Sequence, residues 1–332
     1  MTGLNFARKY INPVRRLIIW LEGFNPREAV AESIREPITR SFSHQGLNLN
    51  VMSFNIRRGT RRDGRNHWMF RRPLVREVLN RYRPDVLGLQ EALDFQMSEI
   101  RAMLPGYEKV GVGNLGGGRG LHTAIFYDAI RFFVSEAGTF WFSTTPDIPR
   151  SRGWGNIIPR TCTWARLVER DSGRAFYFYN IHLDHLSRRS RKKSVVLLTR
   201  HIQGRRFPDP FILTGDFNAG EENPSIGYLK GGNRLKMEAG LPRFNPVPLK
   251  DTLRERYPHP LQTVTYHGYR RYFFRFRFDY IFVPPAVQVQ DATIIRLQRR
   301  NCFPSDHFPL FSRVVLPVVD SSLPGDCVVI PD

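Results

Sequence analysis

The feature that most restricts the fold of this sequence is a series of short, β-rich apolar runs, each ended or interrupted by a polar residue. An acid, an amide or a histidine occurs in each of the runs VMSFNI, DVLGLQE, YNIHLDH, ILTGDFN, FRFDYIFV and FPSDHFPL. Such residues are poor strand formers, and an unpaired ionisable group buried away from water costs several kcal/mol. A single one is usually a turn former or a helix cap, but the repetition indicates one shared polar site.

Strand alternation places several of these polar residues on common faces. Side chains two residues apart point to the same side of a strand, so Asn180, His182 and Asp184 in YNIHLDH share one face. Asp216 and Asn218 share one side of a strand end in the same way. The runs therefore predict strands whose ends carry the functional groups.

Segments whose apolar residues have helical spacing lie between the strand-like runs. This spacing occurs in RPLVREVLNRY, FQMSEIRAMLP and SRKKSVVLLTRHIQG. Interleaved strands and helices without internal repeats predict one continuous α/β domain. We place this domain at residues 47–317, after an N-terminal helical extension and linker at residues 1–46 and before a C-terminal tail at residues 318–332.

The inventory of polar residues restricts the chemistry. Carboxylates and amides without cysteine ligands are hard oxygen donors, which suit Mg²⁺ or Mn²⁺. A zinc site would use His182 and His185, but on a strand these two histidines face opposite ways. The sequence contains neither the G-x-S-x-G motif of a serine hydrolase nor a P-loop.

Six motifs in order resemble a known superfamily. MSFNIR, LGLQE, NIHLDH, TGDFN, FDYIFV and SDHFP are similar to motifs of the endonuclease/exonuclease/phosphatase superfamily, the magnesium-dependent phosphodiesterases that include deoxyribonuclease I. The resemblance covers roughly residues 47–317, and the stretch 140–167 looks like a bacterial-type branch near the deadenylases and nocturnin. It implies a four-layer α/β/β/α sandwich of two mainly antiparallel sheets, with the site at one edge.

The resemblance implies metal-binding and water-activating roles for five residues. Glu91 matches the main metal carboxylate, with Asn55 beside it, and Asp306 turns toward the metal side. Asp216 resembles the residue that orients or deprotonates the attacking water, and Asn218 the amide that positions it. One or two metal ions are compatible with these motifs.

Further residues match groups that contact the phosphate. His182 resembles the histidine that donates to a phosphate oxygen or to the leaving group. His307 would contact the scissile phosphate and be oriented by Asp279, while the neighbouring Asp306 faces the other way on the same strand. Tyr127 and Arg160 are candidate substrate contacts, for which a core role and a structural role are the alternatives.

The charge of the chain favours phosphate-bearing partners. Lysines and arginines number 50 against 30 acidic residues, a net charge of +20. Arginines cluster just beyond several motifs, as at Arg188, Arg189 and Arg191 after HLDH, and Arg57 and Arg58 after the first motif. We expect these clusters to bind a polyanion such as nucleic acid, and the alternative is a solvated basic surface.

The N-terminal segment and the cysteines indicate where in the cell the protein is located. The apolar run in RRLIIWLEGF is too short to span a membrane, so the segment is either a helix packed on the protein or a basic amphipathic segment on anionic lipid. Three cysteines without a CxxC spacing predict reduced thiols and a cytoplasmic protein, with secretion and membrane-surface association as alternatives.

Together these features predict a Mg²⁺-dependent phosphodiesterase that acts on nucleic acid by metal-assisted attack of water with a His-Asp pair. One alternative is a phosphoinositide or phospholipid phosphoesterase at a membrane surface. The other is a non-catalytic, basic nucleic-acid-binding module.

Overall fold

The computed structural model describes residues 46–232, 235, 244–258, 263–269 and 276–317. The predicted helical extension at residues 1–46 lies outside the described residues except for Gly46, and the predicted tail at residues 318–332 lies outside them entirely. Within the described part, the first strand begins at Leu47 and the last strand ends at Leu316.

One six-stranded sheet contains both the first and the last of these strands. Its order is β11-β12-β1-β2-β4-β3, and β1 and β2 are parallel while the other neighbours are antiparallel. The strands are β1 (Leu47–Asn55), β2 (Val86–Ala92), β3 (Tyr107–Val110), β4 (His122–Asp128), β11 (Gln288–Ile294) and β12 (Leu310–Leu316).

The second six-stranded sheet is built from the middle of the chain. Its order is β5-β6-β7-β8-β10-β9, with β7 and β8 parallel and the other neighbours antiparallel. The strands are β5 (Phe132–Trp141), β6 (Thr161–Glu169), β7 (Ala175–His182), β8 (Phe211–Asp216), β9 (Lys250–Asp251) and β10 (Asp279–Val283).

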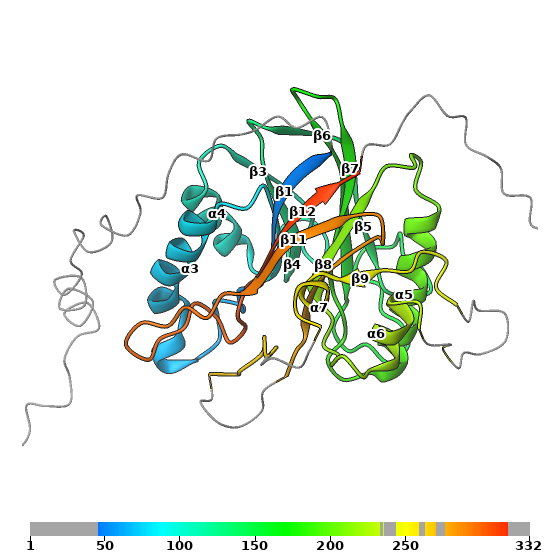
Figure 1. The fold of residues 1–332 in the computed structure, drawn as a ribbon. Coiled ribbons are helices and arrows are strands. Elements are labelled where there is room, and N and C mark those ends of the chain that lie inside the picture. Colours follow the sequence, from blue (N-terminus) through cyan, green and yellow to red (C-terminus); the bar gives the residue numbers. More distant parts are fainter. Residues whose placement is uncertain (1–45, 233–234, 236–243, 259–262, 270–275, 318–332) are drawn as a thin grey trace, which may run out of the picture. The chain divides into compact units, whose positions relative to one another are not determined.

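Helices cover the outer faces of the two sheets. Figure 1 shows α3 (Trp68–Tyr82) and α4 (Asp94–Met103) outside the first sheet, and α5 (Arg188–Gln203) and α6 (Pro224–Leu229) outside the second. A 3-10 helix η1 (Gly64–Asn66) and a short helix α7 (Thr252–Arg256) complete the described helices. The four-layer sandwich is thus confirmed, and the three helical segments predicted from spacing correspond to α3, α4 and α5. None of the helices in the described part is both long and apolar enough to cross a membrane.

Both faces of the central strands are buried, as the sequence of β1 illustrates, whereas the edge strands β5 and β11 are partly exposed. Leu49 and Val51 lie in the apolar core that fills the space between the sheets, where residues of β8 and β10 meet them. Met52 and Phe54 lie instead in the core beneath α3 and α4. Burial of each such side chain contributes about 1.5–3 kcal/mol, so β1 anchors three layers at once.

The strand register gathers the functional ends of the strands at one edge. The parallel pairs β1–β2 and β7–β8 all end there, since Asn55 pairs with Gln90 and His182 pairs with Asp216. The antiparallel strand β10 begins at the same edge, because Asp279 pairs with Asp216. Polar residues far apart in the chain therefore meet.

Candidate active site

A β-bulge aims Glu91 at the site. Alternation along β2 would turn Glu91 toward the helix layer, beside Leu87 and Leu89, but the strand is irregular between Gln90 and Ala92. The backbone of Glu91 is left-handed, with φ 65°, a conformation that costs a non-glycine residue roughly 1–2 kcal/mol. A bulge commonly redirects a side chain next to a functional site, and here it brings the carboxylate to the edge of the sheet.

Asn55 links the two sheets at this edge. Its side-chain amide donates to Glu91 Oε1 at 3.3 Å and to Asp216 Oδ2 at 3.0 Å. The second oxygen of Glu91 accepts from the backbone N–H of Arg58 at 3.3 Å. Glu91 and Asn55 thus stand side by side as predicted.

Asp216 is buried at the end of β8. Burial raises its pKa to about 7, the positive charge of His307 opposes this effect, and the charge of Asp279 adds to it. Its Oδ1 accepts from the backbone N–H of Asn218 at 2.9 Å, and the Asn218 amide donates to the Leu183 carbonyl at 3.0 Å. A carboxylate with a pKa near neutrality can accept a proton at physiological pH.

His307 lies between two carboxylates. Its Nδ1 donates to Asp279 Oδ2 at 2.8 Å, and its Nε2 is 3.8 Å from Asp216 Oδ2. Burial opposes a charge on the ring, but the charges of Asp279 and Asp216 prevail and raise the pKa of His307 to about 10. The imidazole is therefore protonated at neutral pH, and the predicted His307–Asp279 pair is present.

His182, in contrast to His307, is a neutral imidazole. Burial, the charge of Arg160 and the charge of His307 hold its pKa well below the usual range. Arg160 Nη1 donates to His182 Nε2 at 3.0 Å, and Nη2 donates to His185 Nδ1 at 2.8 Å. Nε2 accepts this bond in the structure, and its donation to a phosphate oxygen or a leaving group stays a prediction. Arg160, a predicted substrate contact, does lie at the site.

Asp306 pairs with an arginine that the sequence assigned only to a basic cluster. Arg57 Nη1 donates to Asp306 Oδ2 in an ion pair. The segment that carries Asp306 and His307 precedes β12 and is not itself a strand, so the two side chains do not diverge by strand alternation as predicted. They diverge because Asp306 is drawn to Arg57 and His307 to Asp279.

Two predicted substrate contacts are corrected by the structure. Tyr127 pairs with Val86 at the start of β2, at the end of the sheet opposite Glu91, and it packs in the core between the sheets. Arg191 is buried, and its Nη1 donates to the Asp184 carbonyl at 2.7 Å. It supports the turn after β7, whereas Arg188 and Arg189 at the start of α5 are exposed.

A buried polar network beneath the site joins the two sheets. The Gln90 amide on β2 donates to Asn180 Oδ1 on β7 at 2.7 Å, and Thr214 Oγ1 on β8 donates to the same oxygen at 3.2 Å. Gly88 permits this close approach, since a Cβ there would lie 2.2 Å from Thr214 Oγ1. The network fixes Glu91 and Asn55 relative to Asp216.

Aromatic rings flank His307. The Tyr266 ring lies 4.9 Å from the imidazole and stacks on Phe278 at 5.5 Å, which stacks on Phe276 at 5.3 Å. Phe276 is exposed, so the stack leads from the histidine to the surface.

Two sets of residues could hold a metal ion. Candidate ligand atoms of Asp216, Asp279 and His307 lie within 4.8 Å of one another. A metal-binding imidazole must be deprotonated, however, and the pKa of His307 is raised to about 10. Glu91 offers hard carboxylate oxygens that fit a divalent cation better, while Asn55 turns its NH2 group to Glu91 and its oxygen to the Arg57 N–H.

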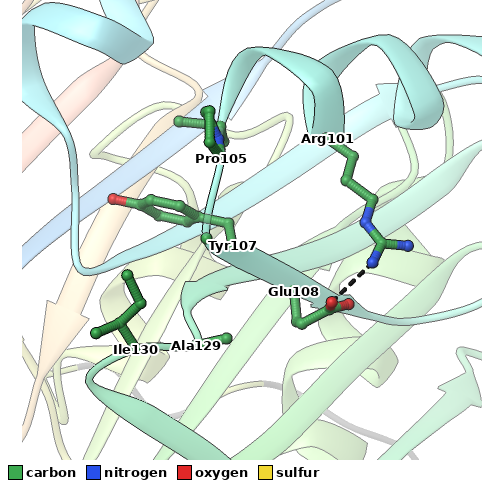
Figure 2. Close-up of a pocket in the computed structure, with 8 residues that line it drawn as sticks. Arg101, Pro105, Tyr107, Glu108, Ala129 and Ile130 are labelled. Atoms are coloured by element: carbon green, nitrogen blue, oxygen red, sulfur yellow. Dashed lines mark hydrogen bonds and ion pairs between the residues drawn. The ribbon is translucent and has the colours of Figure 1, made fainter.

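A separate shallow pocket lies away from this site. Its volume is about 380 Å³, and Figure 2 shows Tyr107, Ala129 and Ile130 beside the Arg101–Glu108 ion pair of 2.7 Å. Tyr107 pairs with Asp128 where β4 ends, which is the edge of the sheet opposite Glu91.

A two-sheet sandwich with acids, amides and histidines at one edge defines a metal-dependent phosphoester hydrolase with the deoxyribonuclease I-like fold. The profile of the Endonuclease/Exonuclease/phosphatase family matches residues 52–307, and the chain belongs to this family. The superfamily inferred from the motifs is thereby confirmed.

Several relatives resemble the chain over most of its length. An endonuclease/exonuclease/phosphatase family protein from Bacteroides thetaiotaomicron is 30% identical, with a TM-score of 0.72 over 83% of this chain and 100% of that one. The mannosyl-6-phosphatase Bt3783 of the same organism is 31% identical, with a TM-score of 0.69 over 80% and 99%. The catalytic domain of human nocturnin shares the fold at 20% identity, with a TM-score of 0.62 over 82% of this chain and 96% of that domain.

A viral protein is also similar in sequence. The uncharacterized protein L388 of Acanthamoeba polyphaga mimivirus is 30% identical over 196 residues, which are 56% of this chain and 72% of that protein.

Proposed function

We propose that the protein is a Mg²⁺-dependent phosphodiesterase that cleaves nucleic acid. The observation that carries the proposal is the charge pattern of one edge, where Asp216, with its pKa raised to about 7, lies 3.8 Å from the charged His307. A proton acceptor and a proton donor thus stand together beside Glu91 and Asn55.

Glu91 would hold the metal ion in this proposal, and the Asn55 amide that donates to its Oε1 would orient the carboxylate. When bound, a divalent cation would neutralise phosphate charge and polarise a water molecule. The carboxylate oxygens suit Mg²⁺ or Mn²⁺, and the bulge at Glu91 orients this ligand.

The protein's own residues would then divide the proton transfers. Asp216, which the Asn218 backbone N–H and the Asn55 amide hold in place, takes a proton from the attacking water. His307 donates to a phosphate oxygen, and Asp279 keeps it protonated and oriented. Arg160 adds a fixed positive charge, with His182 as its acceptor. These donors act where negative charge increases in the transition state.

Exposed arginines at the same edge support nucleic acid as the substrate. Arg61 and Arg62 follow β1, and Arg188 and Arg189 begin α5 just after β7, and all four are exposed. A basic rim of this kind binds successive phosphates of a polyanion. It would contribute little to a small phosphate ester.

A sugar phosphomonoester is the second candidate. It is favoured by one specific observation, the 31% identity to the mannosyl-6-phosphatase Bt3783 over nearly the whole of that chain. The same donors could act on a terminal phosphate.

A substrate panel tests the proposal. Purified protein with Mg²⁺ is incubated with a single-stranded oligonucleotide, with mannose 6-phosphate and with phosphoinositide vesicles. We expect cleavage of the oligonucleotide and loss of that cleavage in a chelator. Turnover of mannose 6-phosphate alone would favour the second candidate, turnover of vesicles alone would favour a lipid phosphoesterase, and tight binding without turnover would favour a non-catalytic module.

A further inference from the structure

Arg57 bridges two carboxylates next to the candidate metal ligands. Its Nε and Nη2 form a two-pronged ion pair with Asp63, at 2.6 Å to Oδ2 and 2.9 Å to Oδ1, while Nη1 pairs with Asp306. The guanidinium also lies over the Tyr269 ring, 5.4 Å from its centroid. With 22% of its side chain exposed, Arg57 is a mostly enclosed cation.

The surrounding backbone holds Arg57 in place. Its φ of 55° is left-handed, and its N–H donates to Asn55 Oδ1 at 3.0 Å. Its carbonyl accepts from the buried Arg71 at 3.1 Å and from the Gln96 amide at 3.2 Å. The guanidinium is therefore preorganised and is not a mobile surface charge.

The site carboxylates differ in whether a cation already contacts them. Asp306 has Arg57, and both Asp279 and Asp216 have His307. Glu91 accepts only from the Asn55 amide and a backbone N–H, and within the described part of the chain it has no ionic partner. Among these four carboxylates, Glu91 is therefore the one whose negative charge no neighbouring cation neutralises.

We infer that Arg57 takes the place of a second metal ion, so that the site binds a single divalent cation at Glu91. The inference rests on the proposed metal dependence and adds the number of ions and the residue that determines it. Two-metal sites place their ions about 3.5–4 Å apart on shared carboxylates. The acids of the Asp216–Asp279–His307 set already pair with His307, so a second ion would use Asp306 and would displace Arg57 from its ion pairs with Asp306 and Asp63.

Counting bound Mn²⁺ tests the inference without an activity assay. Calorimetric titration of the full chain should give one ion, and electron paramagnetic resonance should show an isolated ion. Arg57→Met should admit a second ion, with a spin-coupled spectrum and a doubled stoichiometry. Arg57→Lys retains the charge and should bind one ion, and Arg57→Met combined with Asp306→Asn should return to one.

Arg131 provides a matched control. It also bridges two carboxylates, Asp85 and Glu169, each at 2.7 Å, and lies over the Phe132 ring at 4.9 Å. These residues stand at the opposite edge, where β5 begins. Arg131→Met should therefore leave one ion bound.

Each other result overturns the inference. Two ions in the wild type, or one ion in a folded Arg57→Met variant, would refute it while the proposed metal dependence stood. A second ion in Arg131→Met would show that the gain is nonspecific. A wild type that binds no Mn²⁺ would refute the metal dependence itself. Two ions in the wild type would refute the inference even if Arg57→Met fails to fold, and Arg57→Gln provides a second neutral variant for the same count.

Discussion

Replacing Asp279 with asparagine should remove the charge that keeps His307 protonated. The carboxylates that surround His307 raise its pKa from 6.5 to about 10 against the effect of burial. At 1.36 kcal/mol per pKa unit, this corresponds to roughly 5 kcal/mol in favour of the protonated ring. In Asp279→Asn the burial remains and the main opposing charge is lost, so the pKa of His307 should fall by several units.

The pH dependence of stability has a defined sign. The folded-state pKa of His307 lies above its unfolded value, so its stabilising contribution is complete below about pH 6.5 and is lost as the pH rises through about 10. Asp279→Asn should flatten this decline. Chemical denaturation of both proteins at a series of pH values measures the difference, and nuclear magnetic resonance of the imidazole measures the pKa directly.

Activity provides the second assay for this pair. Loss of one donor to a developing oxyanion costs about 2.7–4 kcal/mol, a 10²–10³-fold fall in kcat. Asp279→Asn, His307→Ala and the double variant should lose similar activity on a small chromogenic phosphodiester, because residues that act as a unit are not additive. An unchanged His307 pKa in Asp279→Asn, or losses that multiply in the double variant, would refute the reasoning.

Three further predictions address the metal, the rim and the core. Glu91→Gln should fold normally and lose nearly all turnover and Mn²⁺ binding; activity of the wild type in excess chelator would contradict this. For single-stranded oligonucleotides, the logarithm of the affinity falls with the logarithm of the salt concentration by about 0.7 per contacted phosphate. Replacing Arg188 and Arg189 with glutamine should reduce this slope and leave turnover of a small phosphodiester unchanged. An unchanged slope would show that the two arginines belong to a solvated surface. Gly88→Ala should lower the free energy of unfolding by about 1–3 kcal/mol in urea titration, because its Cβ would meet Thr214 Oγ1 at 2.2 Å; a neutral effect would show that the sheets can separate there.

The elements and the chemical inventory of the site could be predicted from local patterns. The β-rich runs VMSFNI and YNIHLDH predicted β1 and β7, and helical spacing predicted α3, α4 and α5. Polar residues at the strand ends identified Asn55, Glu91 and Asp216, which the structure brings to one edge. These features can be predicted from the sequence because each depends only on residues a few positions apart.

Errors arose where the outcome depended on how side chains pack in the folded chain. Tyr127 was expected near substrate, but the β2–β4 register places it at the opposite edge. Arg191 was expected in the rim, but the first turn of α5 buries it against the Asp184 carbonyl. Arg57 was read as one rim arginine among several, and its partner Asp306 lies 249 residues away in the chain.

The sequence by itself determined which polar groups stand at the ends of which strands, because strand alternation and turn chemistry are local. Only the tertiary structure decided their charges. His182 and His307 are both buried histidines near Asp216, yet one is neutral and the other charged. The fold places Arg160 in contact with His182 and Asp279 in contact with His307. The charge of a buried group depends on such neighbours, which only folding brings together.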